Sequence, residues 1–381
     1  MLTADRALDT YRALFPITEH YTYLNHAAVA GLCRPATAAL ATYWQAQSHE
    51  GVYSEPAYMP LIEQNRTQFA RLIHAAPDEI AWVANTSVAI ALVASVLRWR
   101  AGDNIVTSAE QFPSNIYPWL ALQDEGVDTR LVARRDGRVL IEDLVAHMDA
   151  RTRLVAVSWV EFNSGYRQDI AALSALCRAH GALLLVDAMQ GLGGLAADVQ
   201  AWGADFVAAA THKWLLGPQG LGVLYIRRAL LDELRPRLVG WRSVVNADDY
   251  LNYAQDWLPN ARRFEGGTPN LSAHVAFAPV LDLLLEVGPA RIEQQILDLT
   301  GRLITHLQAH GHILVSSPLP GERSGIICFR PRGEEAPADT VARLTTARIS
   351  VAARSGVVRV SPHFYNTAAE IDSLFAPGLL G

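Results

Sequence analysis

The chain is poor in cysteine. Its 381 residues include only three, Cys33, Cys177 and Cys328, and these lie far apart. They offer neither a disulfide framework nor the paired spacing of a metal site, and such sparing use is typical of a reducing cytoplasm. The sequence therefore predicts a cytoplasmic protein without a metal centre.

Excess positive charge and long apolar runs are also missing. The net charge is -6 and the pI is near 6.1, so no basic stripe is available for nucleic acid or anionic lipid. No apolar run approaches the roughly 18 residues that a membrane helix requires. The first ten residues contain Asp5, Arg6 and Asp9 and lack the apolar core of a signal peptide. We expect neither nucleic acid nor membrane as a partner.

The chain does contain an alternation of short apolar runs and amphipathic stretches. Half of its residues are hydrophobic, enough for a large core and two domains. Between residues 80 and 226, short apolar runs alternate with amphipathic stretches, which predicts βαβ units and a mostly parallel sheet. The runs 206–210 and 223–226 are too close for a crossover helix, so we expect an antiparallel pair there.

The pattern changes in the last third of the chain, where helical patterns come before short strands. Two helical patterns, 272–287 and 290–310, precede short strands near 324–330 and 357–361, which indicates a smaller α+β domain. The predicted domains are a large domain, 20–262, and a small domain made of 1–19 and 263–381.

Lys213 is a single lysine in a Gly- and Pro-rich turn between two apolar runs. Burial and nearby positive charge lower the pKa of a lysine, and the neutral amine can form a Schiff base with a carbonyl. Asp187 ends the apolar run 182–186, where open parallel sheets bind ligands. Pyridoxal phosphate (PLP) needs this pair, an amine for its aldehyde and an aspartate that keeps its ring nitrogen protonated. For either residue alone, a surface lysine or a turn-capping aspartate is the alternative.

Five further residues are candidates for cofactor contacts, each with an ordinary structural alternative. Thr86 and Ser87 open an apolar helix and could bind a phosphate or cap the helix. His212 could reach the phosphate or be a plain loop residue. Phe112 could stack on the ring or belong to the core. Gln190 could contact the ring's 3-oxygen or cap a helix.

Arg359 stands inside an apolar strand and therefore needs a partner. Bidentate capture of a substrate carboxylate would provide one, and an internal salt bridge is the alternative.

Together these residues resemble the class V aminotransferase group of fold type I PLP enzymes, which contains cysteine desulfurases, selenocysteine lyases, kynureninases and isopenicillin N epimerase-like proteins. The resemblance runs from Tyr23 to Thr367, and its most specific segments are 186–190, 211–220, 263–269 and 359–367. It implies an α/β fold with a mostly parallel seven-stranded sheet in the large domain and a smaller α+β C-terminal domain.

The resemblance also implies roles for individual residues. Thr268 would reach the phosphate of a neighbouring subunit, which makes a homodimer with shared active sites. The other implied roles are Lys213 as the Schiff-base lysine, Asp187 as the partner of the ring nitrogen, Gln190 as the 3-oxygen contact, Thr86 and His212 as phosphate ligands, and Arg359 as the binder of the substrate α-carboxylate.

Departures from the family pattern narrow the activity. Cysteine desulfurases carry a histidine where this chain has Phe112, and a cysteine on a loop for which the segment 351–359 has no room. Persulfide-forming desulfurase activity is therefore not expected. The family's asparagine near the 3-oxygen aligns with Phe162, and its phosphate-binding serine aligns with Ala210. Asn163 and Thr211 are the neighbouring candidates for those two contacts.

The chemistry expected is removal of the Cα proton of an amino acid, followed by transamination or by β-elimination of the C-S lyase type. An isopenicillin N epimerase-like or kynureninase-like activity is the alternative, and a catalytically silent PLP-fold binding protein is the alternative of another class. His26, Arg354 and His363 are the candidates for proton donors or substrate contacts, and a structural role is the equal alternative for each.

Overall fold

The computed structural model describes residues 8–381, so the first seven residues of the predicted 1–19 segment, and most of the stretch examined for a signal peptide, lie outside it. The strands are β1 (Thr22–Tyr23), β2 (Ile80–Val83), β3 (Asn104–Ser108), β4 (Asp128–Val132), β5 (Thr152–Ser158), β6 (Leu183–Asp187), β7 (Phe206–Ala210), β8 (Gly222–Ile226), β9 (Ile313–Leu314), β10 (Ile327–Arg330), β11 (Ile349–Ser350), β12 (Ala352–Arg354) and β13 (Val357–Val360). The helices are α1 (Asp9–Arg12), α2 (Arg34–Glu50), α3 (Glu55–Tyr58), α4 (Pro60–Leu72), α5 (Thr86–Val96), α6 (Tyr117–Leu120), α7 (Ile141–Ala146), α8 (Ile170–Ala179), α9 (Val199–Trp202), α10 (Leu271–Val287), α11 (Pro289–Ala309), α12 (Pro337–Thr346) and α13 (Ala368–Ser373).

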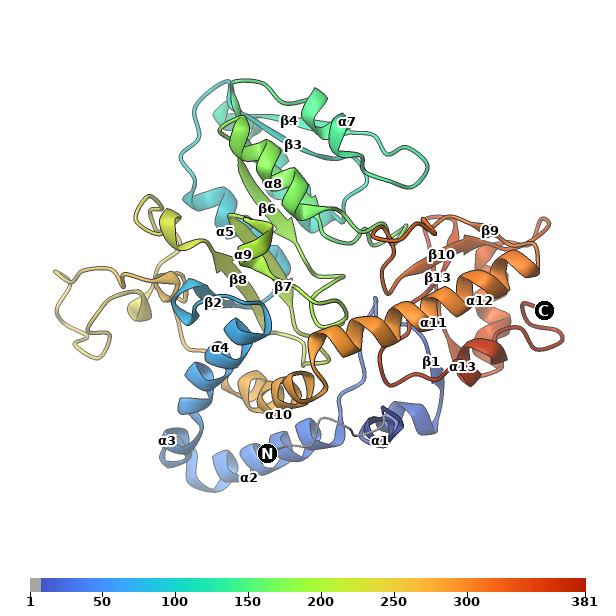
Figure 1. Ribbon diagram of the computed structural model, residues 1–381. Helices are drawn as coiled ribbons and strands as arrows, with labels where there is room; N and C mark the ends of the chain where they lie inside the picture. The colour runs from blue at the N-terminus through green and yellow to red at the C-terminus, as the bar shows by residue number, and fades with distance from the viewer. Residues whose placement is uncertain (1–7) are drawn as a thin grey trace.

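A seven-stranded sheet forms the centre of the larger body (Figure 1). Its strand order is β2-β8-β7-β6-β5-β3-β4, and every pair is parallel except the two that involve β8. This confirms the mostly parallel seven-stranded sheet and the antiparallel pair β7 and β8. The carboxyl ends of β5, β6 and β7 consequently meet at one edge, where α/β sheets bind ligands.

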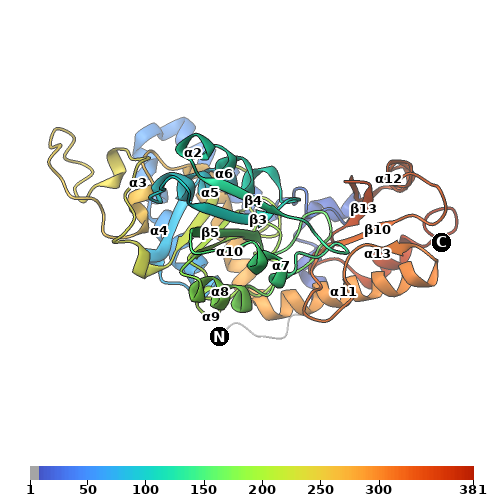
Figure 2. The same ribbon diagram turned by 90° about the horizontal axis from the view of Figure 1, so that it is seen from above.

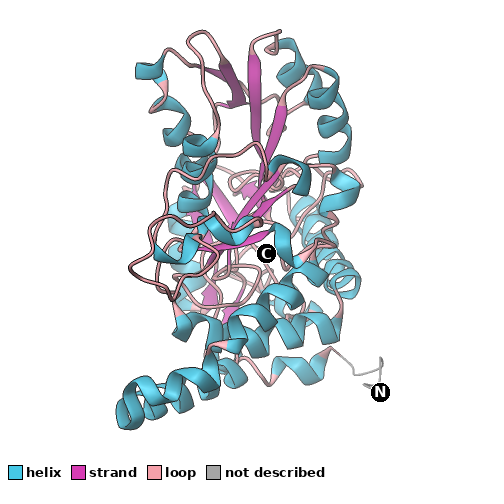
Figure 3. Cartoon of the chain, turned by 90° about the vertical axis from the view of Figure 1, so that its left-hand side faces the viewer, coloured by secondary structure: helices cyan, strands magenta, loops and turns pink. Residues whose placement is uncertain are grey.

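Both faces of this sheet are covered by helices, as Figure 3 shows. Along β6, Leu184 and Val186 join one hydrophobic cluster with α8, and Leu185 joins the opposite cluster with α5. Successive strand residues point to opposite faces, so a strand covered on both sides needs apolar residues throughout. The continuous apolar runs of the sequence therefore follow from burial on two faces.

The smaller body contains an antiparallel sheet of order β12-β13-β10-β9, packed against α11 and α12. It lies at the opposite end of the molecule from the long loop between β8 and α10 (Figure 2). β1 pairs in parallel with β11, so the start of the chain is joined to its C-terminal part. This connection brings residues 25–29 past the edge of the large sheet.

The packing of α10 bears on the predicted division into domains. It packs against α2 and α4 of the large body, although residue 263 was predicted to begin the small domain. Twelve of its 17 residues are buried. In residues 8–381 no single helix is long and apolar enough to cross a membrane; α10 and α11 pass that test only jointly and are bent by 79°.

Candidate active site

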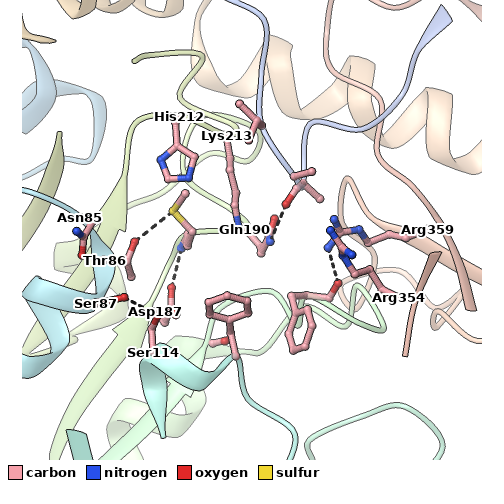
Figure 4. A pocket seen from close by; sticks show the side chains of 17 residues that line it. Asn85, Thr86, Ser87, Ser114, Asp187, Gln190, His212, Lys213, Arg354 and Arg359 are labelled. Atoms are coloured by element: carbon pink, nitrogen blue, oxygen red, sulfur yellow. Dashed lines mark hydrogen bonds between the residues drawn. The ribbon is translucent and has the colours of Figure 1, made fainter. Parts of the chain in front are cut away.

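A cavity of about 570 Å³ lies at the carboxyl ends of β5, β6 and β7 and extends to the small-domain sheet. Figure 4 shows its side chains, with Thr86 and Ser87 at one end, Arg354 and Arg359 at the other, and Lys213 between them. The cavity brings together most of the predicted site residues. These are Thr86, Ser87, Phe112, Asp187, Gln190, His212, Lys213, Arg354 and Arg359.

Lys213 projects into the middle of the cavity from the loop between β7 and β8. Burial lowers the pKa of its amine to about 8, and Arg359 and Arg354 act in the same direction while Asp187 opposes them. An amine with this pKa is partly neutral near pH 7 to 8, and only the neutral form is nucleophilic.

Asp187 is the last residue of β6 and is buried. Its Oδ1 accepts a hydrogen bond from the Met189 N–H at 3.0 Å. One carboxylate oxygen therefore caps a turn, which is the structural role that the sequence left open for Asp187. Burial raises the pKa of its carboxyl to about 6, so the group is ionised at pH 7. The carboxylate therefore offers negative charge to the cavity.

The first turn of α5 forms the opposite end. Asn85 is its N-cap, because its Oδ1 accepts a hydrogen bond from the Val88 N–H, and Thr86 is therefore not the cap. The Thr86 hydroxyl donates to the Met189 sulfur at 3.2 Å, and the hydroxyls of Ser87 and Ser114 are 2.6 Å apart. Helix N-termini with hydroxyls attract anions.

His212 stands above this end of the cavity. Its Nδ1 is buried without a hydrogen-bond partner in residues 8–381. Burial and the adjacent Lys213 lower the pKa of its imidazole, so the ring is neutral at pH 7. A buried polar atom without a partner is rare in a folded protein and points to a missing ligand.

Arg359 and Arg354 provide the positive end. Arg359 is 2% exposed, its Nη1 donates to the Phe162 carbonyl at 3.0 Å, and its Nε has no partner. Burial lowers the pKa of its guanidinium to about 10, and no carboxylate of residues 8–381 forms an ion pair with it. The internal salt bridge considered as an alternative is therefore absent from the described residues. A buried cation needs an anion.

Two phenylalanine rings form an apolar wall between the ends. Phe112 and Phe162 meet edge to face with ring centroids 5.5 Å apart, and the Lys213 Nζ lies 5.7 Å from the centre of the Phe112 ring. Phe112 therefore faces the cavity and is not a core residue.

Three predicted candidates lie elsewhere. His26 and His363 are fully buried and outside the cavity lining. His26 bonds the Ser361 carbonyl and the Tyr365 hydroxyl, and burial lowers its pKa to about 4. Both ring nitrogens of His363 are also hydrogen-bonded, to the Trp214 carbonyl and the Phe364 N–H. Neither histidine therefore has a ring nitrogen free to exchange a proton with a substrate. Thr268 lines a separate cavity of about 290 Å³ beside Trp82.

Asn163 and Thr211, the candidates for the two replacement contacts, have internal hydrogen-bond partners. The Asn163 Oδ1 accepts a hydrogen bond from the Arg134 Nη1 at 2.8 Å, and the Thr211 hydroxyl donates to the carbonyls of Pro218 and Leu221. Neither residue is in the cavity lining, and the Asn163 Oδ1 and the Thr211 hydroxyl are already engaged.

Two serines that line the cavity, Ser114 and Ser158, were not predicted from the sequence. Ser114 and Ser158 lie in loop or strand segments without a motif, and Ser158 was noticeable only as the residue paired with Asp187 across β5 and β6. The Ser158 hydroxyl donates to Gln111, which donates to Glu161 at 2.6 Å. Burial raises the pKa of the Glu161 carboxyl to about 8, so it holds its proton at pH 7.

Comparison with known proteins agrees with this site. Residues 22–374 match the family model described as aminotransferase class V. The chain belongs to this family. It is 32% identical to the uncharacterized aminotransferase YcbU of Bacillus subtilis, covering 95% of each chain. It is also 32% identical to a probable cysteine desulfurase of Methanothermobacter thermautotrophicus, covering 94% of each. As a class V family member, the protein is a PLP-dependent enzyme.

A solved structure supports the fold and the cofactor. The cystine C-S lyase C-DES, in complex with its product cysteine persulfide, has a TM-score of 0.87 and 25% identity to this chain, covering 95% of this chain and 98% of the lyase. Another structure of C-DES contains glycine covalently linked to its PLP cofactor. The predicted fold type I architecture of this family member is thereby confirmed.

Proposed function

We propose that this enzyme removes the Cα proton of an α-amino acid with Lys213 and that its main reaction is transamination. One observation carries the proposal: Lys213 lies between the hydroxyls of Thr86 and Ser87 at the N-terminus of α5 and the buried Arg359, which has no ion-pair partner in the described residues. A PLP enzyme of this family needs a phosphate at one end and a substrate carboxylate at the other.

The residues of the cavity suit PLP. Thr86, Ser87 and His212 would hold its phosphate, and Asp187 its ring nitrogen. PLP supplies an electron sink for the negative charge left at Cα. Lys213, with its depressed pKa, would form the Schiff base and afterwards carry the Cα proton. Phe112 would cover one ring face.

Arg359 would hold the α-carboxylate of the substrate, and Arg354 would add positive charge beside it. Bidentate guanidinium–carboxylate pairing fixes orientation as well as affinity. With the carboxylate held at one end, the substrate would lie beside Lys213, which Figure 4 shows between the two ends. Such positioning is a large part of catalysis by enzymes.

The apolar wall favours transamination over elimination. A leaving thiolate is stabilised by a proton donor, and Phe112 and Phe162 offer none. All three cysteines are buried and outside the cavity lining, so none is available to take up sulfur. β-Elimination of a C–S bond remains the second candidate, because the chain is similar to the lyase C-DES.

We also propose a homodimer. The loop between β8 and α10 extends away from the body (Figure 1), and Leu251 and Tyr253 within it are 84% and 88% exposed. Exposed apolar residues gathered in one loop mark an interface. A second copy bound there would bring Thr268 of one subunit toward the phosphate end of the other. The free, buried cysteines fit a cytoplasmic enzyme.

The test begins with the purified protein and added PLP. We expect a visible absorbance band, and after borohydride reduction a mass increase on the peptide that contains Lys213. A protein that stays colourless and unmodified would overturn the proposal and favour a silent binding protein.

A panel of amino acids then separates the reactions. Transamination predicts a keto acid and the pyridoxamine form of the cofactor, without pyruvate from cystine. Pyruvate and ammonia released without a keto-acid acceptor would instead assign β-elimination. Light scattering of the same sample, with Leu251→Asp as the interface variant, tests the dimer.

A further inference from the structure

Gln190 is held in one orientation by two partners with opposite hydrogen-bonding roles. The indole Nε1–H of Trp214 donates to its Oε1 at 2.9 Å, and its Nε2 donates to the Ala27 carbonyl at 3.1 Å. An indole N–H can only donate and a carbonyl can only accept. The amide therefore cannot be flipped without losing both bonds, and its remaining N–H is left for the cavity that Gln190 lines.

Trp214 itself has no freedom to move. Its ring is 1% exposed and lies in a slot beside two glycines. A Cβ at Gly194 would lie 2.5 Å from ring carbon Cε3, and one at Gly325 would lie 2.3 Å from Cη2. Only glycine fits at either position while the ring stays in place, so packing determines where the indole N–H points.

The backbone of Trp214 is fixed as well. Its carbonyl accepts a hydrogen bond from the His363 Nε2–H at 2.9 Å, because the His363 Nδ1 accepts from the Phe364 N–H. Burial and the nearby His26 lower the pKa of His363 and keep it neutral. Trp214 directly follows Lys213, so this anchor also holds the lysine loop.

We propose that Trp214 is a positioning residue that forces Gln190 to present an N–H donor, and never its oxygen, to the 3-oxygen of bound PLP. Without the indole N–H, the Ala27 carbonyl would be the one partner left to hold the amide, so in part of the molecules the amide could turn its oxygen toward that negatively charged atom. The ring oxygen would then lose a donor and meet a repulsive partner. This inference rests on the proposed function.

The experiment compares absorbance titrations of the PLP-loaded enzyme. Trp214→Phe keeps an aromatic ring in the slot and removes the N–H. A donor to the 3-oxygen favours loss of the Schiff-base proton, so we expect the midpoint of the spectral titration to rise in Trp214→Phe by about one pH unit. Gln190→Leu should raise it similarly, and the double variant should show no further rise.

Trp159→Phe is the matched control. Trp159 is also a buried tryptophan and packs against Gly191, next to Gln190, but it forms no hydrogen bond with the amide. It should leave the midpoint unchanged even if it lowers the melting temperature. A wild-type-like midpoint in folded, PLP-loaded Trp214→Phe, or equal shifts in both tryptophan variants, would overturn the inference. Failure of the wild-type enzyme to develop the spectrum would instead refute the proposed function.

Discussion

The two ends of the cavity are built differently. The end at α5 is made of neutral groups, the hydroxyls of Thr86, Ser87 and Ser114 and the N-terminus of a helix, all within the large body. The other end is made of two guanidiniums, Arg354 and Arg359, carried by the small sheet. Each end attracts an anion, but by different means.

The two kinds of end suit two kinds of ligand, one that stays bound and one that is exchanged in each turnover. Several neutral donors within one body can hold a phosphate without leaving a net charge buried when the phosphate is absent. A bare guanidinium such as Arg359 is costly to bury alone and gains most when a carboxylate arrives. The first end suits a resident cofactor and the second suits a substrate that comes and goes.

The strongest test removes the group between the two ends. Lys213→Ala should lower the turnover rate by about 10⁴-fold or more, because both the Schiff base and the proton carrier are lost. PLP should still bind reversibly at the α5 end, which equilibrium dialysis can measure. Loss of all PLP binding would show that the hydroxyl end does not act alone.

Removing the charge at the substrate end comes next. Arg359→Leu should raise KM for the amino acid about a hundredfold or more, because a desolvated charge pair is lost, and should leave PLP affinity unchanged. Arg359→Lys keeps the charge without the planar fork and should fall between wild type and Arg359→Leu. Steady-state kinetics and PLP titration measure the two quantities separately.

The pH dependence of PLP incorporation links the two ends. Protonated lysine cannot form the Schiff base, so the rate of incorporation into PLP-free enzyme should rise with pH through about 8. Arg359 helps to lower the pKa of Lys213, so Arg359→Leu should move this midpoint to higher pH. Thr86→Ala, which removes no charge, should leave it in place. Stopped-flow absorbance gives the rates.

The smallest effects belong to single hydroxyls. Thr86→Ala should weaken PLP binding by roughly tenfold, the contribution of one hydrogen bond to a charged group, with KM for the amino acid unchanged. Asn85→Ala is the comparison, because it removes the helix cap and should act mainly on thermal stability. An increase in KM as large as that of Arg359→Leu would contradict the division between the ends.

Much of the fold was predictable from local pattern. The strands β5, β6 and β7 are continuous apolar runs because the sheet is covered on both faces. The position of α10 was not predictable, since an apolar helix can pack on either body and only the contact with α2 and α4 decides.

The candidate site also has residues that the sequence could indicate and residues that it could not. Lys213, Asp187 and Arg359 were detectable because each is a charged residue in an apolar context. The role of His26 stayed open, because a buried histidine bonded to the Ser361 carbonyl and the Tyr365 hydroxyl has the same sequence appearance as one that faces a ligand.

The sequence by itself determined the chemistry that is possible: a lysine and an aspartate at strand ends, an arginine inside a strand, and the absence of a cysteine loop. The tertiary structure alone decided which polar atoms remain free for a ligand. His212 Nδ1 and Arg359 Nε have no partner, whereas the polar groups of His363 and Thr211 are all engaged. The physical reason is that hydrogen bonds join residues far apart in the chain, so which groups are left over is settled only when every other partner has been placed.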